Sequence, residues 1–123
     1  MEIFVGTDII EVSRIAKLIE NDNFVHRIFS DAEIRYCEDK VDKAQNYAAR
    51  FAAKEAVFKA LSSKLNSNFS VNWNDISIEK EENGRPVLFL HNHVDISENY
   101  RFDISLSHIK DYAIANVVMY SKN

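Results

Sequence analysis

An alanine-rich stretch over residues 43–64 constrains the fold more than any other part of the chain. It contains seven alanines, at positions 44, 48, 49, 52, 53, 56 and 60. Alanine has the highest intrinsic helix propensity, and its small side chain lets another element approach the helix closely. We therefore expect one long helix over 43–64 that packs against another surface of the domain.

The first half of the chain carries further helix signals. Residues 3–7 are rich in β-branched and aromatic side chains and predict a strand, which a helix over 9–20 should follow. Ser30 and Glu33 have the spacing of a capping box, so another helix should begin there.

The second half reads as strands. Asn83 and Gly84 form a strong hairpin turn signal. The strands predicted around and after it are 75–81, 86–91, 102–107 and 112–120. Segment 92–101 should be irregular or one short turn. Helices that come early and strands that come late favour an α+β class, with a single domain over 1–123 and a mostly antiparallel sheet.

Composition disfavours several functions. The 123 residues carry a net charge of −4, whereas general nucleic-acid binders are usually basic. No apolar run approaches the roughly 20 residues of a membrane span, and the first residues lack the basic region of a signal peptide. The single cysteine, Cys37, cannot form an intrachain disulfide, and together with the one close histidine pair it disfavours a zinc site. We therefore expect a cytoplasmic protein that binds neither nucleic acid nor membrane.

Glu55 stands out on the alanine-rich helix. At about 100° per residue it shares a face with Ala48, Phe51 and Phe58, which should point inward. A carboxylate on such a face is costly unless it is paired, hydrogen-bonded or bound to a metal. Two readings stay open: a pair with Lys59 at i,i+4, and a metal ligand or catalytic acid.

Asp8 also has two readings. It can cap the expected helix, with Glu11 at the third helical position. It can also serve as an oxygen ligand held at a strand end, and two carboxylates with open positions are a normal way to hold magnesium beside substrate phosphates. The only two glycines, Gly6 and Gly84, exclude a glycine-rich phosphate loop.

Three segments read in order resemble the holo-acyl-carrier-protein synthases, a 4′-phosphopantetheinyl transferase family. They are GTDIIEVSRI at 6–15, RFAAKEAVFKA at 50–60, and ISLSH at 104–108 followed by DYA at 111–113; NGRP at 83–86 matches the family's hairpin. The resemblance covers essentially the whole chain and implies transfer of 4′-phosphopantetheine from coenzyme A to a serine of an acyl carrier protein, in support of fatty acid biosynthesis.

The same resemblance implies roles for individual residues. Asp8 and Glu55 would bind Mg²⁺, and Lys59 would act with them beside the transferred phosphate. The residues that would bind coenzyme A are Arg50, Lys59, His108, Gly84 and Pro86. The family usually carries a glycine after its central helix, whereas residues 61–68 contain none. The glycine-poor stretch favours one alternative, a carrier-binding homologue without catalysis. A second alternative is a different magnesium-dependent phosphoryl-transfer or hydrolytic enzyme, which the lack of any other phosphate-binding motif disfavours.

Partners follow from the same resemblance. Arg14 matches a basic residue of the family that meets the acidic carrier, away from the metal site. Lys17 lies three positions on, so it should project from the same side of the helix, and Arg27 is expected nearby. The alternative is an ordinary solvated helix face. The family is typically trimeric, with its site shared between adjacent subunits. An apolar surplus over residues 104–118 for so small a domain also suggests a homotrimer.

Overall fold

The computed structural model describes residues 1–62 and 71–122. The elements are β1 (Ile3–Glu11), α1 (Val12–Leu18), α2 (Asp22–Ile28), α3 (Asp31–Glu38), α4 (Lys43–Leu61), the 3-10 turn η1 (Trp73–Asp75), β2 (Ile76–Lys80), β3 (Pro86–Leu90), α5 (Val94–Asn99), β4 (Tyr100–His108) and β5 (Tyr112–Ser121). Among the described residues, no helix combines the length and apolar character needed to cross a bilayer.

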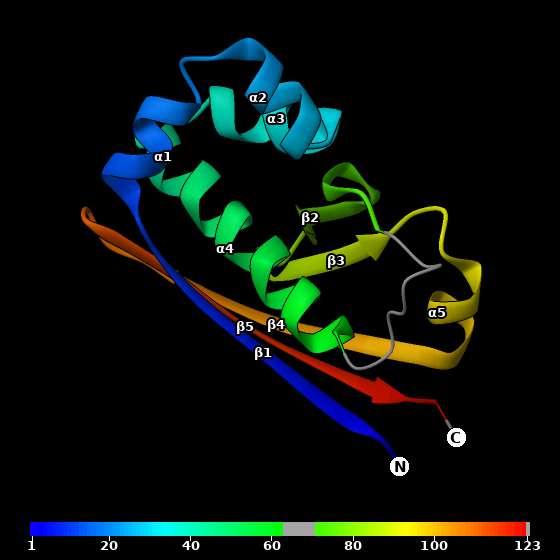
Figure 1. The fold of residues 1–123 in the computed structure, drawn as a ribbon. Coiled ribbons are helices and arrows are strands. Elements are labelled where there is room, and N and C mark those ends of the chain that lie inside the picture. Colours follow the sequence, from blue (N-terminus) through cyan, green and yellow to red (C-terminus); the bar gives the residue numbers. More distant parts are fainter. Residues whose placement is uncertain (63–70, 123) are drawn as a thin grey trace.

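Two antiparallel sheets enclose the long helix. β1, β5 and β4 pair in that order, and β2 pairs with β3 as a separate hairpin. Helix α4 lies across one face of the three-stranded sheet, with the hairpin and helices α1 to α3 gathered on its other side (Figure 1). The predicted α+β class with antiparallel sheets is confirmed.

Helix α4 is the centre of the core. Four of its alanines, Ala48, Ala52, Ala53 and Ala56, are wholly inaccessible to solvent. Small side chains let the helix axis approach the sheet, where Ala113, Ala115 and Val117 of β5 are equally buried. The predicted long helix and its close packing are confirmed up to Leu61, and its expected last residues, 63 and 64, lie outside the described part of the chain.

The first strand is longer than predicted, and this changes the reading of Asp8. β1 continues to Glu11, pairing Ile9 with Ile114 and Ile10 with Ala113. The helix predicted from residue 9 begins only at Val12 and ends at Leu18, and its N-cap is Glu11, which makes no side-chain cap bond. Pairing along the whole of β5 outweighs the local helical pattern. The capping alternative for Asp8 is therefore wrong.

Other local signals have mixed outcomes. The capping box of Ser30 and Glu33 is present at the start of α3. Helix α2 was not predicted; it begins where the Asn21 side chain accepts a hydrogen bond from the Phe24 amide, and it buries Val25 and Ile28. Within 92–101, the expected irregular segment contains the six-residue helix α5.

Candidate active site

Asp8 faces helix α4 because strand and helix touch at a glycine. A Cβ added to Gly6 would lie 1.8 Å from the carbonyl oxygen of Ala56, so any side chain there would push β1 away from α4. Side chains alternate along a strand, and Asp8 therefore points to the same side as Gly6. This contact brings Asp8 beside the turn of α4 that carries Glu55 and Lys59.

Lys59 is tied to the strand. Its Nζ donates to the Thr7 carbonyl oxygen at 2.8 Å and to Asp8 Oδ1 at 3.2 Å. Asp8 is 18% exposed and Lys59 is 54% exposed, so this ion pair opens to solvent. Within the described part of the chain, Lys59 pairs with Asp8 and not with Glu55. The i,i+4 pair proposed for Glu55 is therefore not formed.

Glu55 is half-buried in a field of mixed sign. Burial, and then the negative charge of Asp8, raise the pKa of the Glu55 carboxyl above its ordinary value. The positive charges of Lys59 and Arg14 oppose this effect without cancelling it. Two carboxylates thus lie close enough to repel each other, and a bound cation would relieve that repulsion.

This donor set fits Mg²⁺ in part. Over residues 1–62 and 71–122 there is no cluster of three or more histidine, cysteine or carboxylate side chains that could enclose a metal. Asp8 and Glu55 could together offer two hard oxygen ligands, which would leave most coordination positions open. Magnesium keeps several waters and commonly binds through one or two carboxylates plus substrate phosphates. The pair suits an ion that is shared with a phosphorylated substrate.

A second cluster lies on another part of α4. A pocket of about 370 Å³ brings together Arg50, Gly84, Pro86 and His108, four of the five residues predicted to bind coenzyme A. Lys59, the fifth, does not line it. The His108 ring Nδ1 lies 2.9 Å from Gln45 Oε1, which holds the ring at the end of β4.

Arg50 is the unusual residue of this pocket. It is 2% exposed, and its Nε has no hydrogen-bond partner in the described residues. One terminal nitrogen, Nη1, donates to the Asn46 carbonyl oxygen at 3.3 Å. A buried guanidinium with an unsatisfied donor is costly, and an anion in the pocket would satisfy it.

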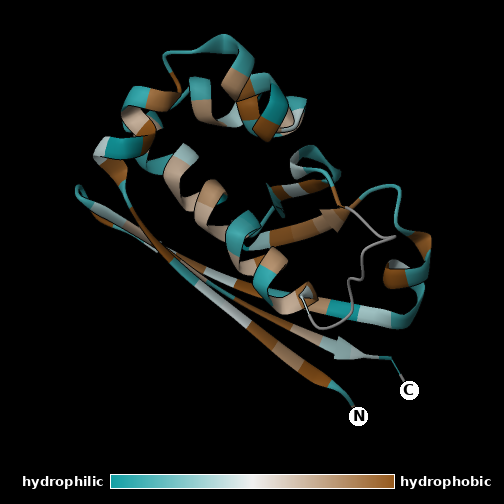
Figure 2. Ribbon diagram, viewed as in Figure 1, coloured by the Kyte–Doolittle hydropathy of each residue, from teal (hydrophilic) through white to brown (hydrophobic). Residues whose placement is uncertain are grey.

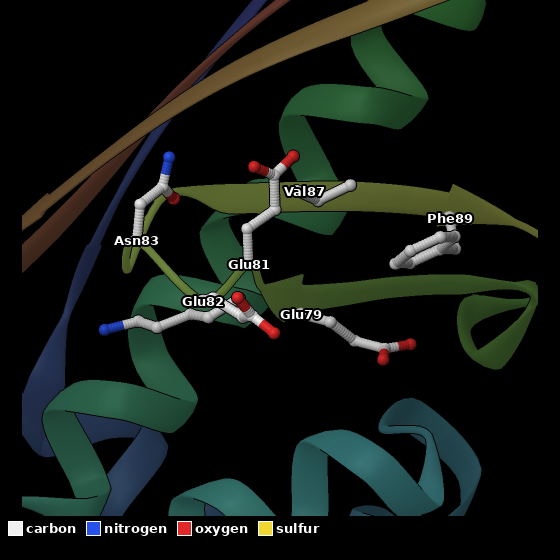
Figure 3. Close-up of a pocket in the computed structure, with 7 residues that line it drawn as sticks. Glu79, Glu81, Glu82, Asn83, Val87 and Phe89 are labelled. Atoms are coloured by element: carbon white, nitrogen blue, oxygen red, sulfur yellow. The ribbon is translucent and has the colours of Figure 1, made fainter.

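The hairpin shapes the pocket entrance. Gly84 has a φ of +83°, a left-handed conformation that residues with a Cβ rarely adopt, and this closes the turn between β2 and β3. A larger hollow of about 640 Å³ along the hairpin is lined by Glu79, Glu81 and Glu82 (Figure 3). Three carboxylates repel a phosphate, so the hollow at Arg50 is the better anion site.

The two clusters lie on different sides of the molecule. Asp8 is on β1 and His108 is on β4, the two outer strands of the sheet, with β5 between them (Figure 1). Around α4, Arg50 and Lys59 differ by nine residues, which places their side chains about 180° apart. A single chain therefore holds the two predicted halves of the site apart.

The predicted docking residues are accessible. Arg14 and Lys17 are exposed on α1, and Arg27 is exposed in the last turn of α2. One expectation is wrong: Arg14 does not lie away from the metal site, because its charge lowers the pKa of Glu55. The same short helix therefore borders both the solvent and the acidic pair.

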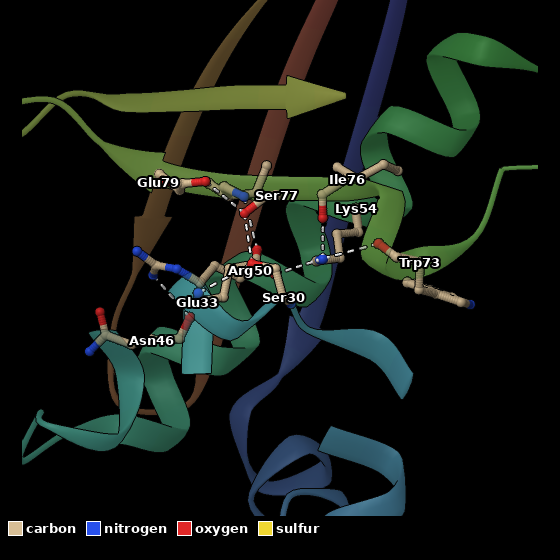
Figure 4. A network of polar contacts seen from close by, with 10 residues as sticks. Ser30, Glu33, Asn46, Arg50, Lys54, Trp73, Ile76, Ser77 and Glu79 are labelled. Atoms are coloured by element: carbon tan, nitrogen blue, oxygen red, sulfur yellow. Dashed lines mark hydrogen bonds and ion pairs between the residues drawn. The ribbon is translucent and has the colours of Figure 1, made fainter. Parts of the chain in front are cut away.

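Sequence analysis missed a buried ion pair beside the site. Lys54 Nζ lies 2.7 Å from Glu33 Oε1, and both side chains are inaccessible to solvent (Figure 4). Lys54 also donates to the carbonyl oxygens of Trp73 and Ile76. The available signal was the spacing of Lys54 from Tyr47, which places the lysine on a buried helix face seven residues on.

The glycine-poor stretch 61–68 falls almost entirely outside the described residues; only Leu61 and Ser62 are within them.

Known protein sequences match this chain over most of its length. Residues 4–117 match the sequence model of the 4′-phosphopantetheinyl transferase superfamily. A holo-[acyl-carrier-protein] synthase of Ruminiclostridium cellulolyticum is 42% identical, covering 97% of this chain and 92% of the relative. One of Chlamydia pneumoniae is 41% identical, covering 94% and 95%.

Solved structures agree with the sequence matches. The Helicobacter pylori holo-[acyl-carrier-protein] synthase in complex with coenzyme A has a TM-score of 0.79 and 32% identity, covering 94% of this chain and 99% of that one. The Chronobacterium ammoniagenes ACPS–CoA complex has the same fold, with a TM-score of 0.84, 24% identity and full coverage of both chains. The chain therefore belongs to the 4′-phosphopantetheinyl transferase superfamily and, within it, to the holo-[acyl-carrier-protein] synthases.

Proposed function

We propose that this chain transfers 4′-phosphopantetheine from coenzyme A to a serine of an apo acyl carrier protein, yielding the holo carrier and adenosine 3′,5′-bisphosphate in support of fatty acid biosynthesis. One observation carries the proposal beyond family membership. Helix α4 presents a carboxylate–lysine cluster on one side and an anion-seeking buried arginine on another. A substrate with several phosphates uses both kinds of site.

Asp8 and Glu55 would hold Mg²⁺ in this reaction. The ion, when bound, neutralises charge on the pyrophosphate of coenzyme A. Lys59 would add a second positive charge at the same oxygens, since its ammonium already lies 3.2 Å from Asp8 Oδ1. Phosphoryl transfer depends mainly on positioning and on such charge neutralisation.

Glu55 is our candidate for the general base. The serine hydroxyl oxygen forms a bond to the β-phosphorus, and its proton passes to a Glu55 carboxylate oxygen. The bond between that phosphorus and the oxygen bridging to the α-phosphate breaks, and adenosine 3′,5′-bisphosphate leaves. Glu55 would accept the proton directly or through a water bound to the metal.

A homotrimer would bring the two separated clusters together, with the Arg50 pocket of one subunit facing the acidic pair of the next. The helices lie on one face of the three-stranded sheet, and hydrophobic stretches are visible along β1 (Figure 2). Because side chains alternate along a strand, Ile3, Val5 and Ile9 point to the opposite face, and they are 59%, 63% and 62% exposed. Within residues 104–118, Ile104 and Val117 are buried, whereas Ile109 and Tyr112 are 64% and 48% exposed, so exposed apolar side chains lie on β1 and at the β4–β5 turn. Exposed apolar area of this kind favours self-association.

Light scattering on wild type and on Val5→Glu tests the trimer. We expect a trimer for wild type, and for the variant a monomer with little transfer. Full activity from a wild-type monomer at micromolar concentration would refute the shared site.

Carrier docking would use Arg14 and Lys17. The chain is acidic overall, so attraction to an acidic carrier must come from a local basic face. We place the protein in the cytoplasm, where acyl carrier and coenzyme A would be met; the single cysteine, Cys37, is buried and unpaired, which suits a reducing compartment.

The deciding experiment combines the protein with coenzyme A, Mg²⁺ and an apo acyl carrier protein, and then measures the mass of the carrier. A gain of one phosphopantetheine group identifies a synthase. Carrier binding without any gain in mass would identify a non-catalytic homologue, and a gain that persists in chelator would exclude the role of the metal.

A further inference from the structure

Lys59 binds a carboxylate that the metal would also use. Its Nζ lies 3.2 Å from Asp8 Oδ1, and the same ammonium donates to the Thr7 carbonyl oxygen at 2.8 Å. Asp8 is one of the two carboxylates proposed to hold Mg²⁺. Two cations on one carboxylate repel each other at short range, so Lys59 and the ion compete for Asp8.

The strand that carries Asp8 gives Lys59 a second acceptor. β1 is an outer strand of the three-stranded sheet and pairs only with β5. The Thr7 carbonyl oxygen belongs to the backbone of this strand, so its position does not depend on any side-chain rotamer. Lys59 can therefore release Asp8 and still be held beside it.

The Lys59 side chain is also free to change its partner. It is more than half exposed, so its bond to Asp8 opens to solvent. Ion pairs of this kind are individually weak, and lysine is a point charge on a flexible stem. Lys54, five residues earlier on α4, is by contrast inaccessible and paired with Glu33. Of these two lysines, only Lys59 can exchange one acceptor for another without breaking a buried pair.

No other cation takes this place. Over residues 1–62 and 71–122, Lys59 is the only basic residue in an ion pair with Asp8, and Glu55 has no ion pair. Arg14 is close enough for its charge to lower the pKa of Glu55, but it bonds to neither acid within those residues. The Asp8–Lys59 bond is therefore the contact that metal binding has to replace.

The donor substrate offers Lys59 a different acceptor. This step rests on the proposed function, in which Lys59 binds an oxygen of the coenzyme A pyrophosphate. Hydrogen bonds between an ammonium and a phosphate oxygen are charge-assisted and strong, so donor binding should draw Lys59 away from Asp8. Asp8 is then released for Mg²⁺ when the pyrophosphate is present to supply further oxygen ligands.

We propose that Lys59 makes the binding of Mg²⁺ depend on the donor: it occupies Asp8 in the free enzyme and passes to the pyrophosphate when coenzyme A binds. Lys59 thus disfavours metal binding to the free enzyme and favours it in the donor complex. The coupling is reciprocal, so Mg²⁺ must raise the affinity for coenzyme A by the same factor. Lys59 keeps its proton throughout the exchange.

Calorimetry with Mg²⁺ alone tests the competition without turnover. Lys59→Met should bind Mg²⁺ about three- to tenfold more tightly than wild type, because no ammonium then competes for Asp8. Lys59→Arg, which keeps the charge, should bind it no more tightly than wild type. Lys43→Met is the matched control, since Lys43 lies at the other end of α4 and pairs with Glu38 at 3.3 Å. Unchanged or weaker Mg²⁺ binding by Lys59→Met would overturn the proposal.

A second titration, at saturating coenzyme A, tests the coupling. Coenzyme A should tighten Mg²⁺ binding several-fold more in wild type than in Lys59→Met, which has no ammonium to move. Arg14→Met removes a nearby charge without removing a bond to Asp8, so it should keep the wild-type coupling. Equal tightening in wild type and Lys59→Met would refute the exchange, even if the variant binds Mg²⁺ alone more tightly.

The mass of the carrier separates this proposal from the proposed function. If wild type modifies the carrier but Lys59→Met shows neither tighter Mg²⁺ binding nor reduced coupling, the exchange is wrong while the synthase stands. If the carrier gains no mass but both titrations give the expected result, the exchange stands and the proposed function fails.

Discussion

Lys54 and Glu55 are consecutive residues of α4 that belong to two differently built charge clusters. Lys54 and its partner Glu33 are both inaccessible to solvent. Every contact of the pair is internal: Lys54 donates to two carbonyl oxygens, while Glu33 accepts from the amides of Ser30 and Ile78. This cluster joins α3, α4 and β2 and leaves no room for a ligand.

The cluster around Glu55 is open to solvent and its charges are only partly paired. Asp8, Glu55 and Lys59 are partly exposed, and Lys59 reaches only one of the two carboxylates. The repulsion between the acids remains in the folded protein, and burial together with this repulsion raises the pKa of Glu55. A fully satisfied cluster fixes structure, whereas an unsatisfied one is available for a substrate and a metal.

The largest expected effect concerns the unsatisfied cluster. Asp8→Ala and Glu55→Ala should each lower kcat on the order of a thousandfold. Each variant lacks one of the two carboxylates proposed to hold the Mg²⁺ that would neutralise charge on the phosphates. Neither variant should lower the midpoint of urea unfolding appreciably. Asp8 is not a helix cap, and the ionised Glu55 carboxylate is itself unfavourable in the folded chain, as its raised pKa indicates. Near wild-type transfer by either variant with Mg²⁺ as the only metal would refute the two-carboxylate site.

Lys54→Met should lower the stability of the fold, where the two preceding variants lower activity. It leaves Glu33 as an unpaired buried carboxylate, and breaking a buried pair in this way costs about 3–5 kcal/mol of folding free energy. Equilibrium urea unfolding measures the loss. Glu33→Gln/Lys54→Met should recover part of it, since the remaining buried group is then neutral. If Lys54→Met folds as stably as wild type, the pair does not hold α3 to α4.

Arg14→Glu tests whether Arg14 acts both in carrier docking and on the charge of the acidic cluster. Reversing this exposed charge should raise the KM for the carrier, by about 1–3 kcal/mol in binding terms and less at high salt. Because the charge of Arg14 also lowers the pKa of Glu55, the acidic limb of the pH–rate profile should move to higher pH. Lys17→Glu should show only the first effect. A carrier KM that is unchanged at low salt would exclude α1 as the docking face.

The smallest effect is a gain in stability. The pKa of Glu55 is higher in the folded chain than its ordinary value of 4.5, so ionised Glu55 opposes folding above its folded pKa, and the effect vanishes below 4.5. Glu55→Gln should therefore raise the thermal midpoint slightly at neutral pH and leave it unchanged near pH 4. Added Mg²⁺ should stabilise wild type more than the variant. Equal midpoints at both pH values would argue against repulsion within the cluster.

Local sequence signals predicted the elements whose formation depends on near neighbours. Alanine density predicted α4, and the Ser30–Glu33 spacing predicted the start of α3. Where a segment pairs with a distant one, the local pattern failed: residues 9–11 look helical but extend β1, because β5 supplies partners about 100 positions further on. Long-range pairing is absent from any short window of sequence.

Some features of the candidate site could also be predicted from sequence, and others could not. Sequence alone identified Glu55 as a carboxylate on an apolar helix face and, through the order of its motifs, the family of the chain. Only the tertiary structure showed that Asp8 lies against α4 beside Gly6. It also showed that Lys59 forms its ion pair with Asp8 and not with Glu55, and that Lys54 and Glu33 form a buried ion pair. Residue type and spacing set which charges a helix carries, but the packing of the other elements decides which of those charges find partners and which remain open to a ligand.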